Sequence, residues 1–157
     1  MLYAIVKKLN IAGIVNDIQN RQSIAHINTL ITNNGATFYE GAAVINFQNN
    51  TTKITVNQGT HIRGELHIFK YGGEITIGEH CYVGDHSRIW SGDQITIGNF
   101  VQISHNVNII DTSAHEFDAY ERAERYVDLM KSGPWTDKGN VTTAPIVIED
   151  YAWIAGC

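Results

Sequence analysis

The chain has 157 residues, of which 43% are hydrophobic and 17% charged, and a formal net charge of −5. These values are typical of one soluble globular domain and exclude a disordered chain, and the acidic balance disfavours a nucleic-acid-binding surface. No apolar stretch is long enough to cross a bilayer, and its two cysteines form no disulfide framework, so we expect a reducing, cytoplasmic location.

Residues 1–35 differ in pattern from the rest of the chain and are expected to form an N-terminal capping segment. Aliphatic residues lie there at the spacing of one helix face: Leu2, Ile5, Val6 and Leu9. A short amphipathic helix of this kind would cover the open end of a repeat body. The alternative is contact with a membrane that holds a lipid-linked substrate, for which only Lys7 and Lys8 supply basic charge.

From about residue 36 short strand-like runs alternate with turns rich in Asn and Gly. Between residues 75 and 109 the aliphatic residues return every six positions: Ile77, Val83, Ile89 and Ile95, then Ile97, Ile103 and Ile109. Before them the expected inward positions are Ile54, Ile62, Leu66, Ile68 and Ile75. Small or β-branched residues fill the fifth place of most hexads: Cys81, Ser87, Val101 and Val107. This period predicts a solenoid of short strands and turns, with Asn and Gly in left-handed corners.

The repeat stops at Ile109, and residues 112–145 form an excursion without hexads. Its apolar residues share the face of a helix: Phe117, Tyr120, Ala123, Val127 and Met130. Long ordered insertions in a regular fold usually carry function. The hexads resume with Ile148 and Ile154, so residues 36–157 are expected to be one β-helix domain. Because the chain ends in mid-hexad, we expect it to be truncated at its C-terminus.

Three segments follow one another in a characteristic order: ITIGEHCYVGDHSRIWSGDQITIGNFVQISHNVNI, IIDTSAHEFDA and PIVIEDYAWIAG. Together they resemble the hexapeptide-repeat acyltransferases, above all the O-acetyltransferases of galactosides, maltose and bacterial polysaccharides. The resemblance covers about residues 50–157. It implies an all-β fold, a left-handed parallel β-helix, assembled as a homotrimer. It also implies that acetyl-CoA, the acyl donor, binds in a groove between neighbouring subunits.

His115 matches the position of the family's catalytic histidine, and the resemblance implies that it is the general base of a direct transfer. A neutral imidazole can take the proton of a sugar hydroxyl as the oxygen attacks the thioester, because its ordinary pKa is about 6.5. Asp111 and Glu116 are close in sequence and are candidates for orienting the ring of His115.

Other residues are candidates for substrate binding. Two corner histidines and two aromatic residues of the excursion are assigned to the acceptor: His86, His105, Tyr120 and Trp135. Two residues of the coil after the excursion are assigned to the cofactor: Trp153 and Ala155. Three other histidines are interpreted as ordinary surface or hydrogen-bonding residues: His26, His61 and His67.

The expected function is acetyl-CoA-dependent O-acetylation of a sugar hydroxyl in a polysaccharide or lipopolysaccharide precursor. Gly84 stands where the galactoside-type members carry an asparagine that helps hold their acceptor, so a simple galactoside is not the expected acceptor. Alternatives are N-acetylation of an amino-sugar nucleotide, serine acetylation, or a non-catalytic trimeric scaffold. A zinc carbonic anhydrase on the same β-helix needs three convergent histidines, and His115 has no nearby partner, so no metal site is expected.

Overall fold

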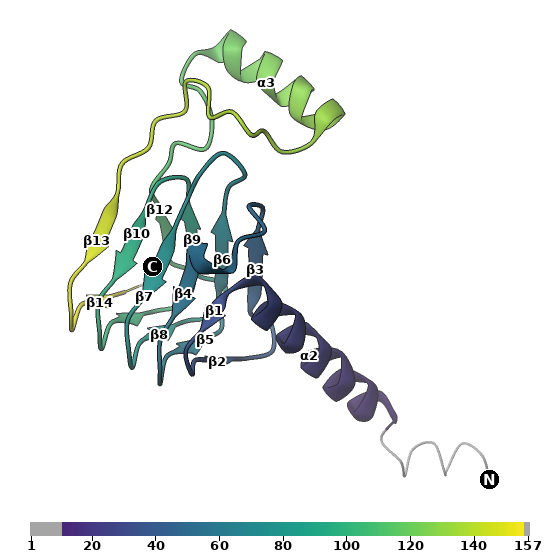
Figure 1. Cartoon of the computed structure of the whole chain (residues 1–157), viewed down its shortest axis with the longest axis vertical. Coiled ribbons are helices and arrows are strands. Elements are labelled where there is room, and N and C mark those ends of the chain that lie inside the picture. The colour runs from purple at the N-terminus through teal and green to yellow at the C-terminus, as the bar shows by residue number, and fades with distance from the viewer. Residues whose placement is uncertain (1–10, 156–157) are drawn as a thin grey trace.

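Short strands stacked in register build the body of this molecule. The computed structural model describes residues 11–155. They form a left-handed parallel β-helix of about four turns, with one helix before it and another inserted late in the chain (Figure 1). The predicted fold class is thus confirmed.

The coils contribute strands to three parallel sheets. Sheet A contains β1 (Thr32–Asn33), β4 (Ile54–Val56), β7 (Ile75–Ile77), β10 (Ile95–Ile97) and β13 (Ile146–Ile148). Sheet B contains β2 (Thr37–Phe38), β5 (His61–Ile62), β8 (Tyr82–Val83), β11 (Gln102–Ile103) and β14 (Trp153–Ile154). Sheet C contains β3 (Ala43–Asn46), β6 (Glu65–Ile68), β9 (Arg88–Ser91) and β12 (Asn108–Ile110), and a single 3-10 turn, η1 (Thr51–Lys53), precedes β4.

Aliphatic ladders fill the interior of the coils, because β-branched side chains pack well between buried parallel strands. Every aliphatic position expected to point inward between residues 54 and 109 is buried, and so are the four small places of the hexads. Ile75 pairs with Ile95, and Ile95 with Ile146. The restart of the hexads two residues after Ile95 has a simple cause: β10 directs both of its ends, Ile95 and Ile97, into the core.

The corners partly follow the sequence expectation. Asn49, Gly59 and Gly73 have the positive φ predicted for Asn and Gly at turns. Aromatic residues also take this conformation, at His80, Phe100 and Tyr151. Their rings stack from coil to coil, with centroids 5.3 Å and 5.2 Å apart. Ring stacking therefore accompanies an unfavourable backbone conformation at a corner where the sequence offers neither Asn nor Gly.

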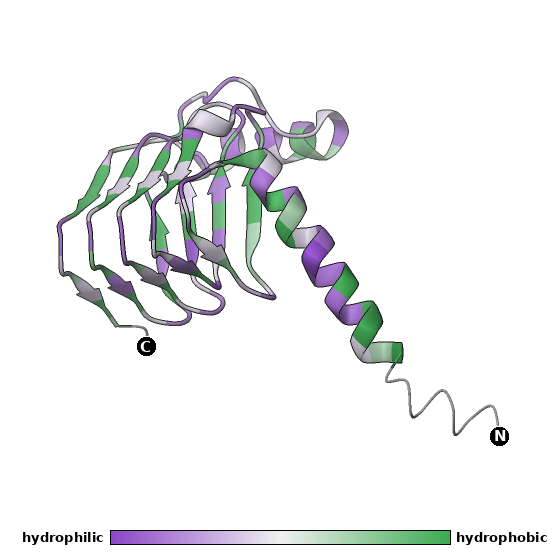
Figure 2. Cartoon of the chain, turned by 60° about the horizontal axis from the view of Figure 1, so that its bottom comes forward, coloured by the Kyte–Doolittle hydropathy of each residue, from purple (hydrophilic) through white to green (hydrophobic). Residues whose placement is uncertain are grey.

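Helix α2 (Ile11–Leu30) precedes the coils and projects away from them (Figure 2). Its C-terminal end packs on the first coil through the buried Ile27, followed by the buried Ile31. Four apolar side chains in the N-terminal half of the helix are exposed: Ile11, Ile14, Val15 and Ile18. The predicted amphipathic face at residues 2–9 lies outside the described residues. No helix between residues 11 and 155 has the length and apolarity needed to cross a membrane.

The excursion leaves the body after β12 and contains helix α3 (Ala119–Ser132). Asp118 caps the helix by accepting hydrogen bonds from the backbone N–H groups of Tyr120 and Glu121. The apolar face predicted for this segment is turned to solvent, as the exposed fractions of Phe117, Tyr120, Val127 and Met130 show (79%, 84%, 49% and 63%). The more buried residues of α3 are Glu121, Arg125 and Leu129.

Candidate functional site

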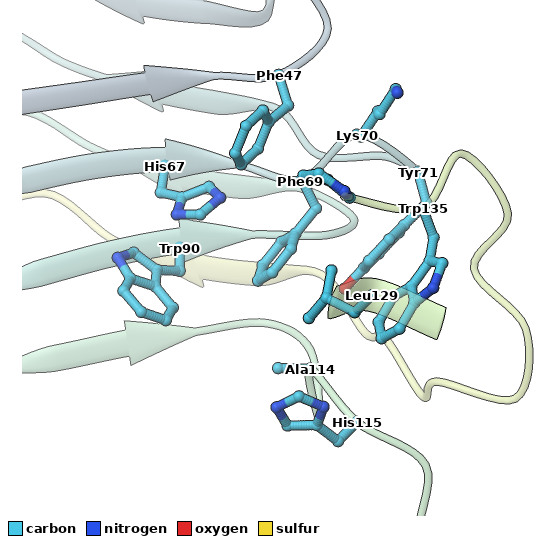
Figure 3. Close-up of a pocket in the computed structure, with 11 residues that line it drawn as sticks. Phe47, His67, Phe69, Lys70, Tyr71, Trp90, Ala114, His115, Leu129 and Trp135 are labelled. Atoms are coloured by element: carbon cyan, nitrogen blue, oxygen red, sulfur yellow. The ribbon is translucent and has the colours of Figure 1, made fainter. Parts of the chain in front are cut away.

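An aromatic pocket of about 190 Å³ opens between sheet C and the excursion (Figure 3). His67 on β6 and Phe69 directly after it alternate with the buried Leu66 and Ile68, which points their side chains outward into the pocket. The complete lining is Phe47, His67, Phe69, Lys70, Tyr71, Trp90, Ala114, His115, Leu129, Pro134 and Trp135. The pocket thus joins residues of the coils to residues of the excursion.

The rings on the body side of the aromatic pocket pack against one another. His67 and Phe69 stack with centroids 4.8 Å apart, and Phe69 and Tyr71 stack at 5.0 Å. Trp90 lies nearly perpendicular to Phe69, at an interplanar angle of 82°. Phe47 meets His67 edge-on. Such offset and edge-to-face contacts fix the rings relative to one another, so this wall is preformed.

Three polar groups of the pocket walls are engaged by the protein itself. The indole Nε1–H of Trp90 donates to Glu65 Oε1 at 2.7 Å, and that of Trp135 donates to Asp128 Oδ2 at 3.0 Å. The hydroxyl of Tyr71 lies 3.1 Å from Thr112 Oγ1. The guanidinium of Arg125 covers the Trp135 ring at 4.2 Å. These walls therefore present mostly apolar surface to an occupant.

His67 differs from the other wall residues, because both of its ring nitrogens are buried and neither has a hydrogen-bond partner in the described structure. Burial lowers the pKa of His67, and the nearby Glu65 carboxylate acts in the opposite direction with a smaller effect. The imidazole is therefore neutral near pH 7. The sequence interpretation of His67 as an ordinary histidine missed its place in the pocket wall.

His115 lies at the rim of the aromatic pocket and is exposed. Its side chain also lines a second depression, the α3 hollow, with Ala119, Arg122, Ala123 and Tyr126. Among the residues that the structure describes, His115 alone belongs to both. Its backbone carbonyl accepts a hydrogen bond from Ser113 Oγ at 2.8 Å, while its ring makes none with the described part of the chain.

The two carboxylates expected to orient His115 have other partners. Asp111 accepts hydrogen bonds from the hydroxyl of Ser91 and from the backbone N–H groups of Gly92 and Asp93, so it fixes the corner of the coil below. Glu116 is buried and lies 2.8 Å from the Nε of Arg125. Neither carboxylate contacts the ring of His115 in the described structure.

The other residues predicted for the site are spread over the molecule. Trp135 lines the aromatic pocket, whereas Tyr120 is exposed on the outer face of α3 and lines neither depression. His86 lines a separate polar depression that also contains Arg63 and Arg88. Exposed positions elsewhere on the coils are taken by His105, Trp153 and Ala155. Of the residues named in this paragraph, only Trp135 lines the aromatic pocket together with His115.

The close stacking of the coils gives Gly84 a structural reason. A Cβ at this position would lie 2.6 Å from the carbonyl carbon of Ser104 in the next coil. The coils could not approach so closely with an asparagine here.

A sequence signal for the aromatic pocket exists. The run His67-Ile68-Phe69-Lys70-Tyr71 places a ring at every second position, in phase with the outward side of β6. Rings at successive outward positions are unusual on a solvated face and favour a covered one. The six-residue period alone does not reveal which segment covers them.

Comparison of the chain with protein-family models, with curated proteins and with solved structures finds no match. No three His, Cys, Asp or Glu side chains gather as a metal site requires, within residues 11–155 of a single chain. The assignment of a function therefore depends on the geometry of the pocket and of His115.

Proposed function

We propose that this chain is an acetyl-CoA-dependent O-acetyltransferase acting on a sugar hydroxyl of a polysaccharide or lipopolysaccharide precursor. The observation that carries the proposal is the position of His115, which lines both the aromatic pocket and the α3 hollow. A base between two binding depressions can contact two substrates together, as a direct transfer between them requires. The resemblance of the hexads supports the same chemistry.

His115 acts as the general base in this proposal. Its neutral imidazole takes the proton of the acceptor hydroxyl while the oxygen attacks the thioester carbonyl. A C–O bond forms, the C–S bond breaks, and the imidazolium returns the proton to the departing thiolate. No covalent acyl-enzyme is needed. The exposed ring of His115 is free to adjust to both substrates, since none of the described side chains holds it.

The acyl donor is placed on the α3 side of His115. Arg122 lines the α3 hollow, and its Nη1 donates to the carbonyl oxygens of Glu116 and Phe117 at 2.8 Å and 3.1 Å. The guanidinium is thereby held beside the depression, where its positive charge favours the phosphates of coenzyme A.

A homotrimer belongs to this proposal, with donor sites completed between neighbouring subunits. The exposed apolar residues of the excursion support association, because large exposed apolar patches mark interaction surfaces. Trp153 and Ala155 lie on the outside of the last described coil and are available to a neighbour. Sedimentation of the whole chain is expected to give a trimer, and a monomer would remove this part of the proposal.

The test is release of the coenzyme A thiol from acetyl-CoA, with and without a panel of sugars, sugar nucleotides and amino sugars. Acceptor-stimulated release is expected, and His115→Ala should lower it by about two to four orders of magnitude. The melting temperature should stay unchanged, because the side chain is exposed. His26→Ala, an exposed histidine on α2, is the matched control. An unchanged rate in His115→Ala would refute the assignment.

A further inference from the structure

The aromatic pocket has a lining that selects among acceptors. Resting on the proposed function, we infer that it holds the apolar face of a six-membered ring with few hydroxyl groups, such as a deoxy sugar. The reacting hydroxyl of this acceptor lies at the rim beside His115.

The size of the pocket sets the size of its occupant. Its volume is about 190 Å³, while an apolar cavity of about 150 Å³ accommodates benzene. A six-membered ring with one or two small substituents therefore fits. The rim at His115 leaves room for the rest of a larger acceptor outside the pocket.

The lining decides the chemistry of this ring. Both indole N–H groups and the Tyr71 hydroxyl are already engaged within the protein. A ligand hydroxyl pressed against these walls would lose its water partners and gain none, which is unfavourable. C–H and methyl groups carry no such penalty, so the pocket favours a ring from which hydroxyl groups are missing.

His67 adds its ring to this apolar lining. Both of its ring nitrogens are buried and out of reach of an occupant, so the imidazole offers no hydrogen bond inside the pocket. Lys70 also lines the pocket, but its side chain is exposed, so its ammonium group stays in contact with water.

We assign the aromatic pocket to the acceptor rather than to the acyl donor for two reasons, the size of the pocket and the position of the cations. An acetyl group has two carbon atoms and would leave most of the volume empty. Arg122, whose guanidinium is held in place by two carbonyl oxygens, lines the α3 hollow, whereas the cation of the aromatic pocket is the exposed Lys70. The acceptor hydroxyl must also be within hydrogen-bond reach of the base, which a ring seated against the same rim allows.

Binding without any acyl donor tests this inference directly. The chain has three tryptophans, and in Trp153→Phe the two that remain, Trp90 and Trp135, both line the pocket. Their fluorescence is titrated with methyl α-galactopyranoside and with its 6-deoxy counterpart. We expect saturable binding of both, about tenfold tighter for the 6-deoxy compound. Equal affinities, or tighter binding of the galactoside, would overturn the inference.

One pocket variant and one surface variant locate the binding. Leu129→Phe fills part of the pocket and should weaken binding of the 6-deoxy compound about tenfold or more, while Met130→Phe, on the exposed side of the same helix, should leave it unchanged. Unchanged affinity for the 6-deoxy compound in Leu129→Phe would mean that it binds elsewhere and would overturn the inference.

Transfer assays separate this inference from the proposed function. Selective binding of the 6-deoxy compound, without release of coenzyme A in any acceptor mixture, would refute the proposed function. The inferred binding site would then still be supported. Transfer with the same kcat/KM for both glycosides would keep the function and overturn the inference. Displacement of the 6-deoxy compound by hexanoyl-CoA, with faster turnover of hexanoyl-CoA than of acetyl-CoA, would assign the pocket to an acyl chain and overturn it as well.

Discussion

The coil body and the excursion are stabilised by different kinds of contact. In the body each inward residue packs on its equivalent in the coils on either side, as Ile77 does between Val56 and Ile97. In the excursion single pairs of unlike residues carry the packing, such as Arg125 with Glu116. A repeat spreads its stability over many equal contacts, whereas the excursion depends on a few specific ones. The candidate site lies where the two regions meet.

Substitution of an inward aliphatic residue of the coils should have the largest effect on the free energy of unfolding. Ile103→Asp places a carboxylate without a partner inside the coils, and we expect a loss of about 4 kcal/mol or more in the free energy of unfolding. Gln102→Asp, the neighbouring outward position on β11, should change it little. Chemical denaturation measures both. A normally stable Ile103→Asp protein would show that the inward register is wrong.

The buried ion pair between Arg125 and Glu116 should stabilise the excursion more than the coils. Arg125→Ala leaves the Glu116 carboxylate buried without its counter-ion, a change that typically costs about 3 kcal/mol or more. Because few contacts join the excursion to the coils, we expect hydrogen exchange to accelerate over residues 112–145 and stay slow in the ladders. Lys131→Ala, in the last turn of α3, is the control. Equal acceleration in the coils would mean that the two regions unfold together.

The smallest expected effect is a change in the stability of the protein with pH. Burial lowers the pKa of His67 in the folded protein, so the unfolded chain binds the proton at higher pH. Stability should therefore decrease as the pH falls below the unfolded value of about 6.5. His67→Phe should remove this contribution, which has a slope of at most about 1.4 kcal/mol per pH unit, and His26→Phe should not. Identical acid sensitivity in wild type and His67→Phe would contradict this account of His67.

The coil body could be predicted from the sequence because the six-residue period determines which side chains are buried. A residue such as Ile89 has like neighbours above and below, so its environment follows from its own repeat. Even the two-residue restart after Ile95 is explained by the geometry of one short strand.

The excursion and the pocket could be predicted only in part. The helix was expected, but the face that it turns to the coils depends on residues far apart in sequence, such as Leu129 and Phe69, which line the same pocket. The same holds for Asp111, which lies near His115 in sequence yet binds the corner formed by Ser91 and Gly92. Proximity in sequence does not determine which partner satisfies a buried carboxylate.

Chemical rescue of His115 is the most direct test of the central claim, that this imidazole between two depressions removes the acceptor's proton. His115→Gly should lose transfer by about hundredfold or more, and free imidazole added to the assay should restore part of the rate in proportion to its concentration. His26→Gly should show neither the loss nor the response. A His115→Gly protein that transfers at the wild-type rate without imidazole would contradict the account.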